Sequence, residues 1–277
     1  MTTRTPWAVA CAILVAALAS AAAQERPPTP PAPSRPAAAT LTADGDARPP
    51  ERPDAAPEGP PAPADPFPAR DGKPFGPPPP PTWFTLAETD AEFAACRLAL
   101  SMLGSRYTVE PPVTDPDDRN CGIARPLRVT HVLADVALSG NPVMRCDTAR
   151  ALGLWTRDFL LPATALMPGA PRLAALETGP AYTCRDRVGT GAVDPKPSEH
   201  GFGNAIDVTG FRLAGAEPMP VAPRGGDGDS AESFQRAARA TACLLFSTVL
   251  GPGSNAAHDD HLHLDVARRG GGWRLCE

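Results

Sequence analysis

Apolar residues at helical spacing predict three helices in the chain beyond residue 83. The first follows a capping-box pattern of Thr89 and Glu92, and apolar side chains recur from residue 93 to residue 103. Asp147 is expected to cap the second helix, and Ser230 the third. The inward faces of these two helices are predicted to carry Ala151, Leu154 and Trp155, and Phe234, Ala237, Ala238, Ala242 and Leu245.

Segments rich in Val, Leu and Ile predict the strands. They cover residues 127–138, 173–184, 204–211 and 261–266, and a Gly-Pro pair interrupts the second of them at 179–180. The last segment is expected to be the final strand of the domain. Helices and strands follow one another without a repeating strand–helix–strand unit, so we expect an α+β fold.

The first 83 residues have patterns of a different kind. A basic residue at Arg4, an apolar run at 8–19 and small residues at 21–23 have the form of a signal peptide, so residues 1–23 would be removed. The apolar run is short for a spanning helix, which needs about 20 residues. Residues 24–83 are about one-third proline, which predicts a disordered linker.

The folded domain is therefore expected at residues 84–277, with no membrane span after signal cleavage. Six cysteines remain in the mature chain, and an even number in an exported protein predicts disulfides. Thiolate zinc ligands are the alternative, but no Cys-x-x-Cys pair occurs. The net charge of −5 disfavours a nucleic-acid partner. We expect the cysteines to pair as neighbours in sequence: Cys96 with Cys121, Cys146 with Cys184, and Cys243 with Cys276.

Three histidines lie within six residues near the C-terminus: His258, His261 and His263. On the strand predicted for residues 261–266, side chains alternate between the two faces. His261, His263 and Asp265 then share one face, and the apolar residues between them face the core. Because neutral imidazole is the commonest metal ligand in proteins, this face is a candidate metal site.

A second polar cluster lies upstream, at His200 and Asp207. Gly201 and Gly203 permit a tight turn between these two residues. One histidine from the downstream cluster would complete a set of two imidazoles and a carboxylate. Three protein ligands leave a fourth position for water, which is the arrangement of catalytic zinc sites.

The pattern resembles the LAS peptidases, which include D-Ala-D-Ala carboxypeptidases and penicillin-insensitive murein endopeptidases. The chain has Ser-x-His-x-x-Gly-x-Ala-x-Asp at residues 198–207, followed far downstream by His-x-His at 261–263. Residues 84–277 also resemble the extensin-like C-terminal domain family of bacteria. The matching segments are Ala-Tyr-Thr-Cys-Arg at 181–185, Ser-Glu-His-Gly-Phe-Gly-Asn-Ala at 198–205, Thr-Val-Leu-Gly-Pro-Gly at 248–253, and Cys276.

The resemblance implies a LAS/hedgehog-like zinc peptidase fold, with a small antiparallel sheet, flanking helices and bracing disulfides. It implies that His200, Asp207 and His263 bind Zn²⁺ and that Ser198 supports these ligands. Asp265 is either a residue that orients a histidine or a surface acid.

The same resemblance supplies the candidate catalytic residues. His261 is the expected general base, and Asp260 is the second choice, because carboxypeptidases of this group have a glutamate there. His258 or Arg185 is expected to stabilise the oxyanion, and Arg185 also to contact the substrate.

The function expected from these residues is that of an exported zinc metallopeptidase. It would hydrolyse peptide stems of peptidoglycan, as a D,D-endopeptidase does, in the periplasm or cell envelope. The alternatives are a non-catalytic wall-binding or structural module and a zinc hydrolase that cuts another amide. Of the remaining polar residues, His131 is expected to be structural, Glu199 to be solvated, and Tyr182 to lie in the core or line a cleft.

Overall fold

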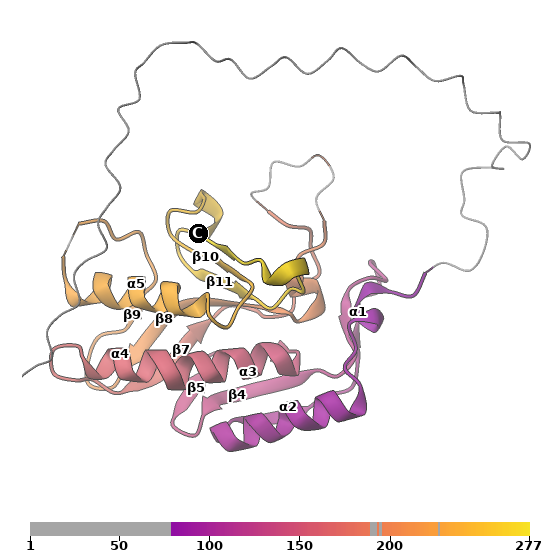
Figure 1. Cartoon of the computed structure of the whole chain (residues 1–277), viewed down its shortest axis with the longest axis horizontal. Coiled ribbons are helices and arrows are strands. Elements are labelled where there is room, and N and C mark those ends of the chain that lie inside the picture. Colours follow the sequence, from indigo (N-terminus) through magenta and orange to yellow (C-terminus); the bar gives the residue numbers. More distant parts are fainter. Residues whose placement is uncertain (1–78, 189–192, 194–195, 227) are drawn as a thin grey trace, which may run out of the picture. The chain divides into compact units, whose positions relative to one another are not determined.

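The computed structural model describes residues 79–188, 193, 196–226 and 228–277 (Figure 1). The predicted signal peptide, and the predicted linker up to residue 78, lie outside the described residues. Within the described ranges, no helix is both long and apolar enough to span a bilayer.

The protein has a mixed α+β fold built on one large sheet. This sheet is ten-stranded and mostly antiparallel, with parallel pairing between β5 and β7 and between β10 and β12, so it is larger and more mixed than expected. Its main path runs β1 (Arg106–Val109), β4 (Leu127–Leu133), β5 (Val136–Leu138), β7 (Leu173–Thr178), β8 (Ala205–Leu213), β11 (Leu262–Asp265), β10 (Thr248–Leu250), β12 (Leu275–Cys276). Beside this path, β6 (Val143–Met144) pairs with β4 and β9 (Met219–Pro220) with β8, while β2 (Val113–Thr114) and β3 (Gly122–Ile123) form a separate two-stranded sheet.

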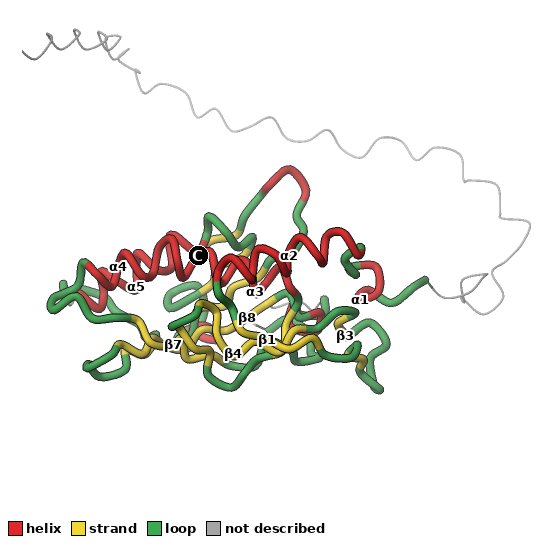
Figure 2. The backbone as a smooth tube through the Cα atoms, turned by 90° about the horizontal axis from the view of Figure 1, so that it is seen from below, coloured by secondary structure: helices red, strands yellow, loops and turns green. Residues whose placement is uncertain are grey.

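The longer helices lie on one side of the sheet, as Figure 2 shows. The helices are α1 (Thr82–Thr85), α2 (Asp90–Leu103), α3 (Cys146–Trp155), the π-turn (Thr156–Leu160), α4 (Leu161–Ala165) and α5 (Ser230–Ala242). Helix α3, the second of the predicted helices, continues without a break through the π-turn into the short helix α4. Trp155, Thr156, Leu160 and Leu161, the residues at these junctions, all have helical backbone angles.

The capping box at the start of α2 is confirmed, but the two other predicted caps are wrong. The Thr89 side chain accepts a hydrogen bond from the Glu92 N–H, and the Glu92 carboxylate accepts one from the Thr89 N–H. Helix α3 begins after Arg145, so Asp147 lies in its first turn. A carboxylate there stabilises the helix by its interaction with the positive end of the helix dipole. Helix α5 is capped by Asp229, one residue before Ser230. Ala237, expected inside, is exposed.

Three strand predictions need correction. The apolar segment 127–138 is a hairpin of β4 and β5 with a turn between them. The next strand ends at Thr178, because Gly179 and Pro180 disfavour its continuation and no strand follows in 179–184. The strand near the C-terminus is not the last, since β12 pairs with β10.

The main core lies between the sheet and the helices. Trp155 is fully buried, meets Phe211 and Phe246 edge-on, and donates a hydrogen bond from its indole N–H to the Ala238 carbonyl oxygen. On the strand that carries the downstream histidines, Leu262 and Leu264 are fully buried, as the alternation predicts.

The three disulfides are present, but only one of the predicted pairs is correct. Cys243 pairs with Cys276, as expected, which ties β12 to the end of α5. The other two predictions fail because pairing follows tertiary packing. The packing of α2 against α3 brings Cys96 to Cys146. Cys121, directly before β3, pairs with Cys184, because the chain before β3 contacts the segment that precedes the His200 turn.

Candidate metal centre

A short 3₁₀ turn, Glu199–Phe202, positions His200. The Ser198 hydroxyl accepts a hydrogen bond from the His200 N–H and so caps this turn. Gly203 ends it with a left-handed backbone, φ +65°, which favours glycine. Gly201 is required for a second reason, because a Cβ there would lie 2.9 Å from the Cys121 sulfur.

Two neighbouring strands position Asp207 and His263. Strands β8 and β11 are antiparallel, and Asp207 stands directly opposite His263 in their register. Directly opposed residues project from the same face of a sheet. Because Leu262 and Leu264 point into the core, His263 and Asp207 are held on the other face.

These three side chains converge on one point. His200 Nε2 lies 3.1 Å from His263 Nδ1 and 3.2 Å from Asp207 Oδ1, and His263 Nδ1 lies 3.1 Å from the same oxygen. The three atoms therefore form a nearly equilateral triangle. His200 and His263 are buried, and Asp207 is half-buried.

The outer nitrogens of both imidazoles face acceptors. His200 Nδ1 lies 3.2 Å from the Ala181 carbonyl oxygen, and His263 Nε2 lies 3.3 Å from Asp265 Oδ2. Each of these nitrogens must carry a proton to make its hydrogen bond, so in the neutral rings the inner nitrogens turn lone pairs toward the Asp207 carboxylate. Asp265 is 3% exposed and orients His263, which excludes the reading of it as a surface acid.

Such a triangle fits a tetrahedral metal ion. Zinc bonds of about 2.0–2.1 Å to nitrogen and oxygen would place the ligand atoms about 3.3–3.4 Å apart in an ideal tetrahedron. A proton on His263 Nδ1 could form a hydrogen bond to His200 Nε2 or to Asp207 Oδ1, but not to both. The contact between His200 Nε2 and Asp207 Oδ1 would still have no proton between its two lone pairs. A cation satisfies all three atoms at once, so the residues could hold zinc.

The electrostatics of the metal-free centre also favour positive charge. Burial raises the pKa of Asp207, but its contacts with His200 and His263 outweigh burial and hold the pKa far below its usual range. Burial lowers the pKa of His263, but hydrogen bonds to Asp207 and Asp265 outweigh it and raise the pKa to about 9. The same His263 contact overcomes burial and lowers the pKa of Asp265.

His261 stands beside the triangle. Its Nδ1 donates to Asp260 Oδ1 at 2.8 Å, and its Nε2 lies 3.6 Å from Asp207 Oδ1. Asp260 itself is 90% exposed, and the hydrogen bond from His261 lowers its pKa.

His258 is buried close to both other downstream rings. Its ring centre lies 5.2 Å from that of His261 and 5.8 Å from that of His263. Burial, together with the charges of His263 and His261, lowers its pKa to about 4. Asn255 Oδ1 accepts the Ala257 N–H, so His258 Nδ1, 2.8 Å from the same oxygen, must be a donor.

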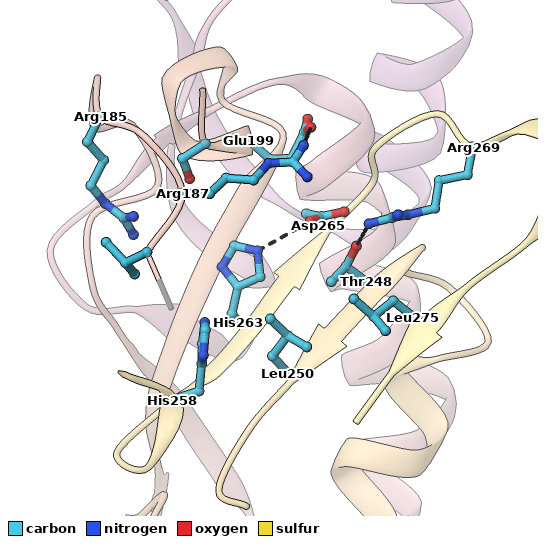
Figure 3. Close-up of a pocket in the computed structure, with 12 residues that line it drawn as sticks. Arg185, Arg187, Glu199, Thr248, Leu250, His258, His263, Asp265, Arg269 and Leu275 are labelled. Carbon is cyan, nitrogen blue, oxygen red and sulfur yellow. Dashed lines mark hydrogen bonds and ion pairs between the residues drawn. The ribbon is translucent and has the colours of Figure 1, made fainter. Parts of the chain in front are cut away.

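A cavity of about 140 Å³ opens beside the centre (Figure 3). His258 and His263 lie on one wall, and Arg185 and Arg269 lie on either side of them in this view. Ser198, predicted to support the ligands, also lines the cavity. The remaining lining residues are Arg187, Val188, Glu199, Thr248, Leu250, Asp265 and Leu275.

Sequence reasoning missed a polar network that leads into this cavity. The buried Arg145 guanidinium pairs with Glu88 and donates to Asn204 Oδ1 at 2.7 Å. Asn204 donates in turn to Glu199, which also pairs with Arg187 on the cavity wall. Glu199 is therefore not solvated as expected. The local signal was its position beside His200 in the motif, but Arg145 and Glu88, which complete the network, are remote in sequence.

The other polar candidates are not members of the triangle. His131 is half-buried on β4 and contacts its neighbour Thr130. Tyr182 is half-buried, and burial raises the pKa of its hydroxyl. Asp118 lies near Cys121 and Cys184, but the disulfide between the two cysteines removes their thiolates as ligands.

A comparison with known families identifies the family of the chain. The family model described as "Extensin-like protein C-terminus" matches residues 94–277. The chain belongs to this family. The match includes the three residues of the triangle, the other histidines of the cluster and all six disulfide cysteines, while α1 and the capping box precede it. No curated protein and no solved structure matches the chain.

Proposed function

We propose that this extensin-like protein is an exported zinc metallopeptidase that hydrolyses peptide bonds in the stems of peptidoglycan. The observation that carries the proposal is the triangle of His200, Asp207 and His263, with atoms 3.1–3.2 Å apart and both inner nitrogens aimed at its centre. The motif resemblance to LAS peptidases supports the same substrate class and a location in the periplasm or cell envelope.

Zinc is the proposed ion because two imidazoles and one carboxylate form a common zinc donor set with an open position. When bound, zinc would supply Lewis acidity, which activates water and polarises an amide carbonyl. Asp265 and the Ala181 carbonyl would hold His263 and His200 in the tautomers that a metal requires.

His261 is the proposed general base. Its Nδ1–H is committed to Asp260, so its Nε2 lone pair faces the side of the triangle at Asp207 and can accept a proton there. Asp260, the other candidate base, would act through His261 as a positioning residue.

Arg185 is the proposed partner of the developing oxyanion. It lines the cavity and is exposed, so its charge can reach an incoming carbonyl. His258 is less suited to this role, because its neutral ring already uses its N–H on Asn255 and leaves only a lone pair at Nε2. His258 would instead accept a hydrogen bond from water or from a substrate N–H.

Metal analysis tests the centre. We expect about one zinc per chain in the wild type and loss of most of it in His200→Ala. His131→Ala is the matched control, because it removes a histidine of β4, which β5 and β7 separate from the strand that carries Asp207. Equal zinc contents in the wild type and His200→Ala would refute the metal site.

Digestion of purified murein sacculi tests the reaction. Soluble muropeptides should appear with the wild type, disappear with chelator, return with zinc, and be absent with His200→Ala. Their masses would identify the bond cut. Co-sedimentation with sacculi without cleavage would favour the wall-binding module, and cleavage between sugar and peptide would favour the other amide hydrolase.

A further inference from the structure

The cavity beside the candidate metal centre carries more positive charge than its own carboxylates balance. Three arginines line it, Arg185, Arg187 and Arg269, against two carboxylates, Glu199 and Asp265. A bound zinc would add further positive charge. The cavity is therefore suited to an anionic group.

Both carboxylates are already committed. Glu199 accepts from Arg187 at 3.0 Å, which also neutralises that arginine. Asp265 accepts from His263 at 3.3 Å and from the Ala267 N–H at 3.1 Å. Neither is engaged with Arg185 or Arg269 in any hydrogen bond or ion pair of the described residues.

Arg269 is the arginine that is both fixed and incompletely bonded. One terminal nitrogen, Nη2, donates to the Thr248 hydroxyl at 2.5 Å. The guanidinium carbon lies 4.9 Å from the centre of the Trp273 ring, which holds the group by a cation–π contact. Its Nε is buried and has no hydrogen-bond partner among the described residues. A buried N–H without an acceptor is unfavourable, so the Arg269 guanidinium keeps donor capacity that the described residues do not use.

We propose that Arg269 binds a carboxylate of the substrate and so determines which peptides are cut, an inference that rests on the proposed peptidase function. Strand β10 sets the distance between the anchor of Arg269 and the candidate metal centre. Leu250 pairs with His263, and Thr248, the anchor of Arg269, stands two residues away on the same face of the strand. Two strand residues span about 7 Å. The recognised carboxylate therefore lies within one or two residues of the bond presented to the metal centre.

Two sources could supply this carboxylate, the C-terminus of the stem peptide or a side chain of one of its residues. Both offer the same planar pair of oxygens to the guanidinium fork. N-acetylated stem peptides in two pairs separate them. One pair has a free or amidated C-terminus, and the other has a free or amidated side-chain carboxylate.

Binding of these four peptides should be measured by calorimetry on chelator-treated protein, so that turnover does not interfere. A charged hydrogen-bonded contact predicts that one of the two amidations weakens wild-type binding about 10- to 100-fold. Arg269→Gln should weaken the free acid by a similar factor and abolish the difference between acid and amide. Arg268→Gln is the matched control, because it removes the same charge from the exposed neighbouring residue, which does not line the cavity.

The amidation that has the effect identifies the source. Equal binding of acid and amide in both pairs by the wild type, or equal losses in Arg268→Gln and Arg269→Gln, would overturn the assignment. The wild-type comparison needs no substitution, so it can overturn the assignment even where Arg269→Gln folds poorly. If sacculi are not cut but the acid preference depends on Arg269, the proposed function fails and the carboxylate site stands. If sacculi are cut and the acid preference is absent, the proposed function stands and the carboxylate site fails.

Discussion

Gly203 joins the turn that carries His200 to strand β8, and its replacement should be unusually costly. Its φ is +65°, and a Cβ there would lie 2.4 Å from Ile123 Cδ1 and 3.2 Å from the Arg145 backbone nitrogen. Ile123 is 1% exposed, so it cannot swing into solvent to make room. Gly215 offers a matched control, because its φ is +75° and a Cβ there would meet no atom within 4 Å.

The two substitutions share one penalty and differ in the other. A left-handed backbone costs an alanine about 1–2 kcal/mol, so Gly215→Ala should lose about that much stability. Gly203→Ala adds the cost of overpacking a filled core, about 1–3 kcal/mol. The expected difference between the variants is therefore about 1–3 kcal/mol.

Urea unfolding at equilibrium measures this difference, with the disulfides kept oxidised and chelator present so that metal binding does not contribute. Zinc affinity provides a second readout. Gly203→Ala should weaken zinc binding because it shifts the His200 turn, whereas Gly215→Ala should not. Equal destabilisation by the two substitutions would show that Ile123 does not confine this position and would refute the packing argument.

Further predictions concern the buried network, the zinc affinity and the proposed base. Arg145→Met should destabilise the protein by about 3–5 kcal/mol in urea unfolding, because it leaves the buried Glu88 carboxylate unpaired; Glu88→Leu combined with it should recover much of the loss. The pKa of His263 in the metal-free protein is about 9, so zinc must displace its proton below that pH. Zinc affinity, measured against a competing chelator, should therefore rise about tenfold per pH unit from pH 6 to pH 8, and a flat profile would contradict this. Asp260→Asn should lower kcat on a stem peptide by about tenfold at most, whereas His261→Ala should lower it by about a hundredfold or more; the reverse order would make Asp260 the base.

The local features of the sequence predicted much of the candidate site. The alternation around His263 identified the face of its strand, because buried leucines on one side leave the other side to the polar residues. The glycines between His200 and Asp207 indicated a tight turn, which the structure confirms as a 3₁₀ turn ending at Gly203. These signals are readable because each lies within a few residues of the feature it predicts.

Features that depend on remote partners were not readable in this way. The partner of Cys121 is fixed by the packing of the segment before β3 against the chain before His200, 63 residues downstream. Asn204 carries no local sign that it accepts a hydrogen bond from Arg145, 59 residues upstream. One-residue errors, such as the cap at Asp229 instead of Ser230, arise because two adjacent residues are both good caps.

The precision of the candidate metal centre derives from the core rather than from the polar residues themselves. Asp207 and His263 are opposed because β8 and β11 pair in a register that also buries Ile206, Val208 and the two leucines of β11. A slip of one residue would expose these apolar side chains and turn the acid or the histidine inward, so the hydrophobic free energy of the sheet selects the register. The third member, His200, is then brought to 3.1 Å from His263 by a turn whose two glycines each permit a close approach. Three polar atoms held this close by packing cannot relax apart without loss of the core, and this constraint is the reason we propose that a cation binds among them.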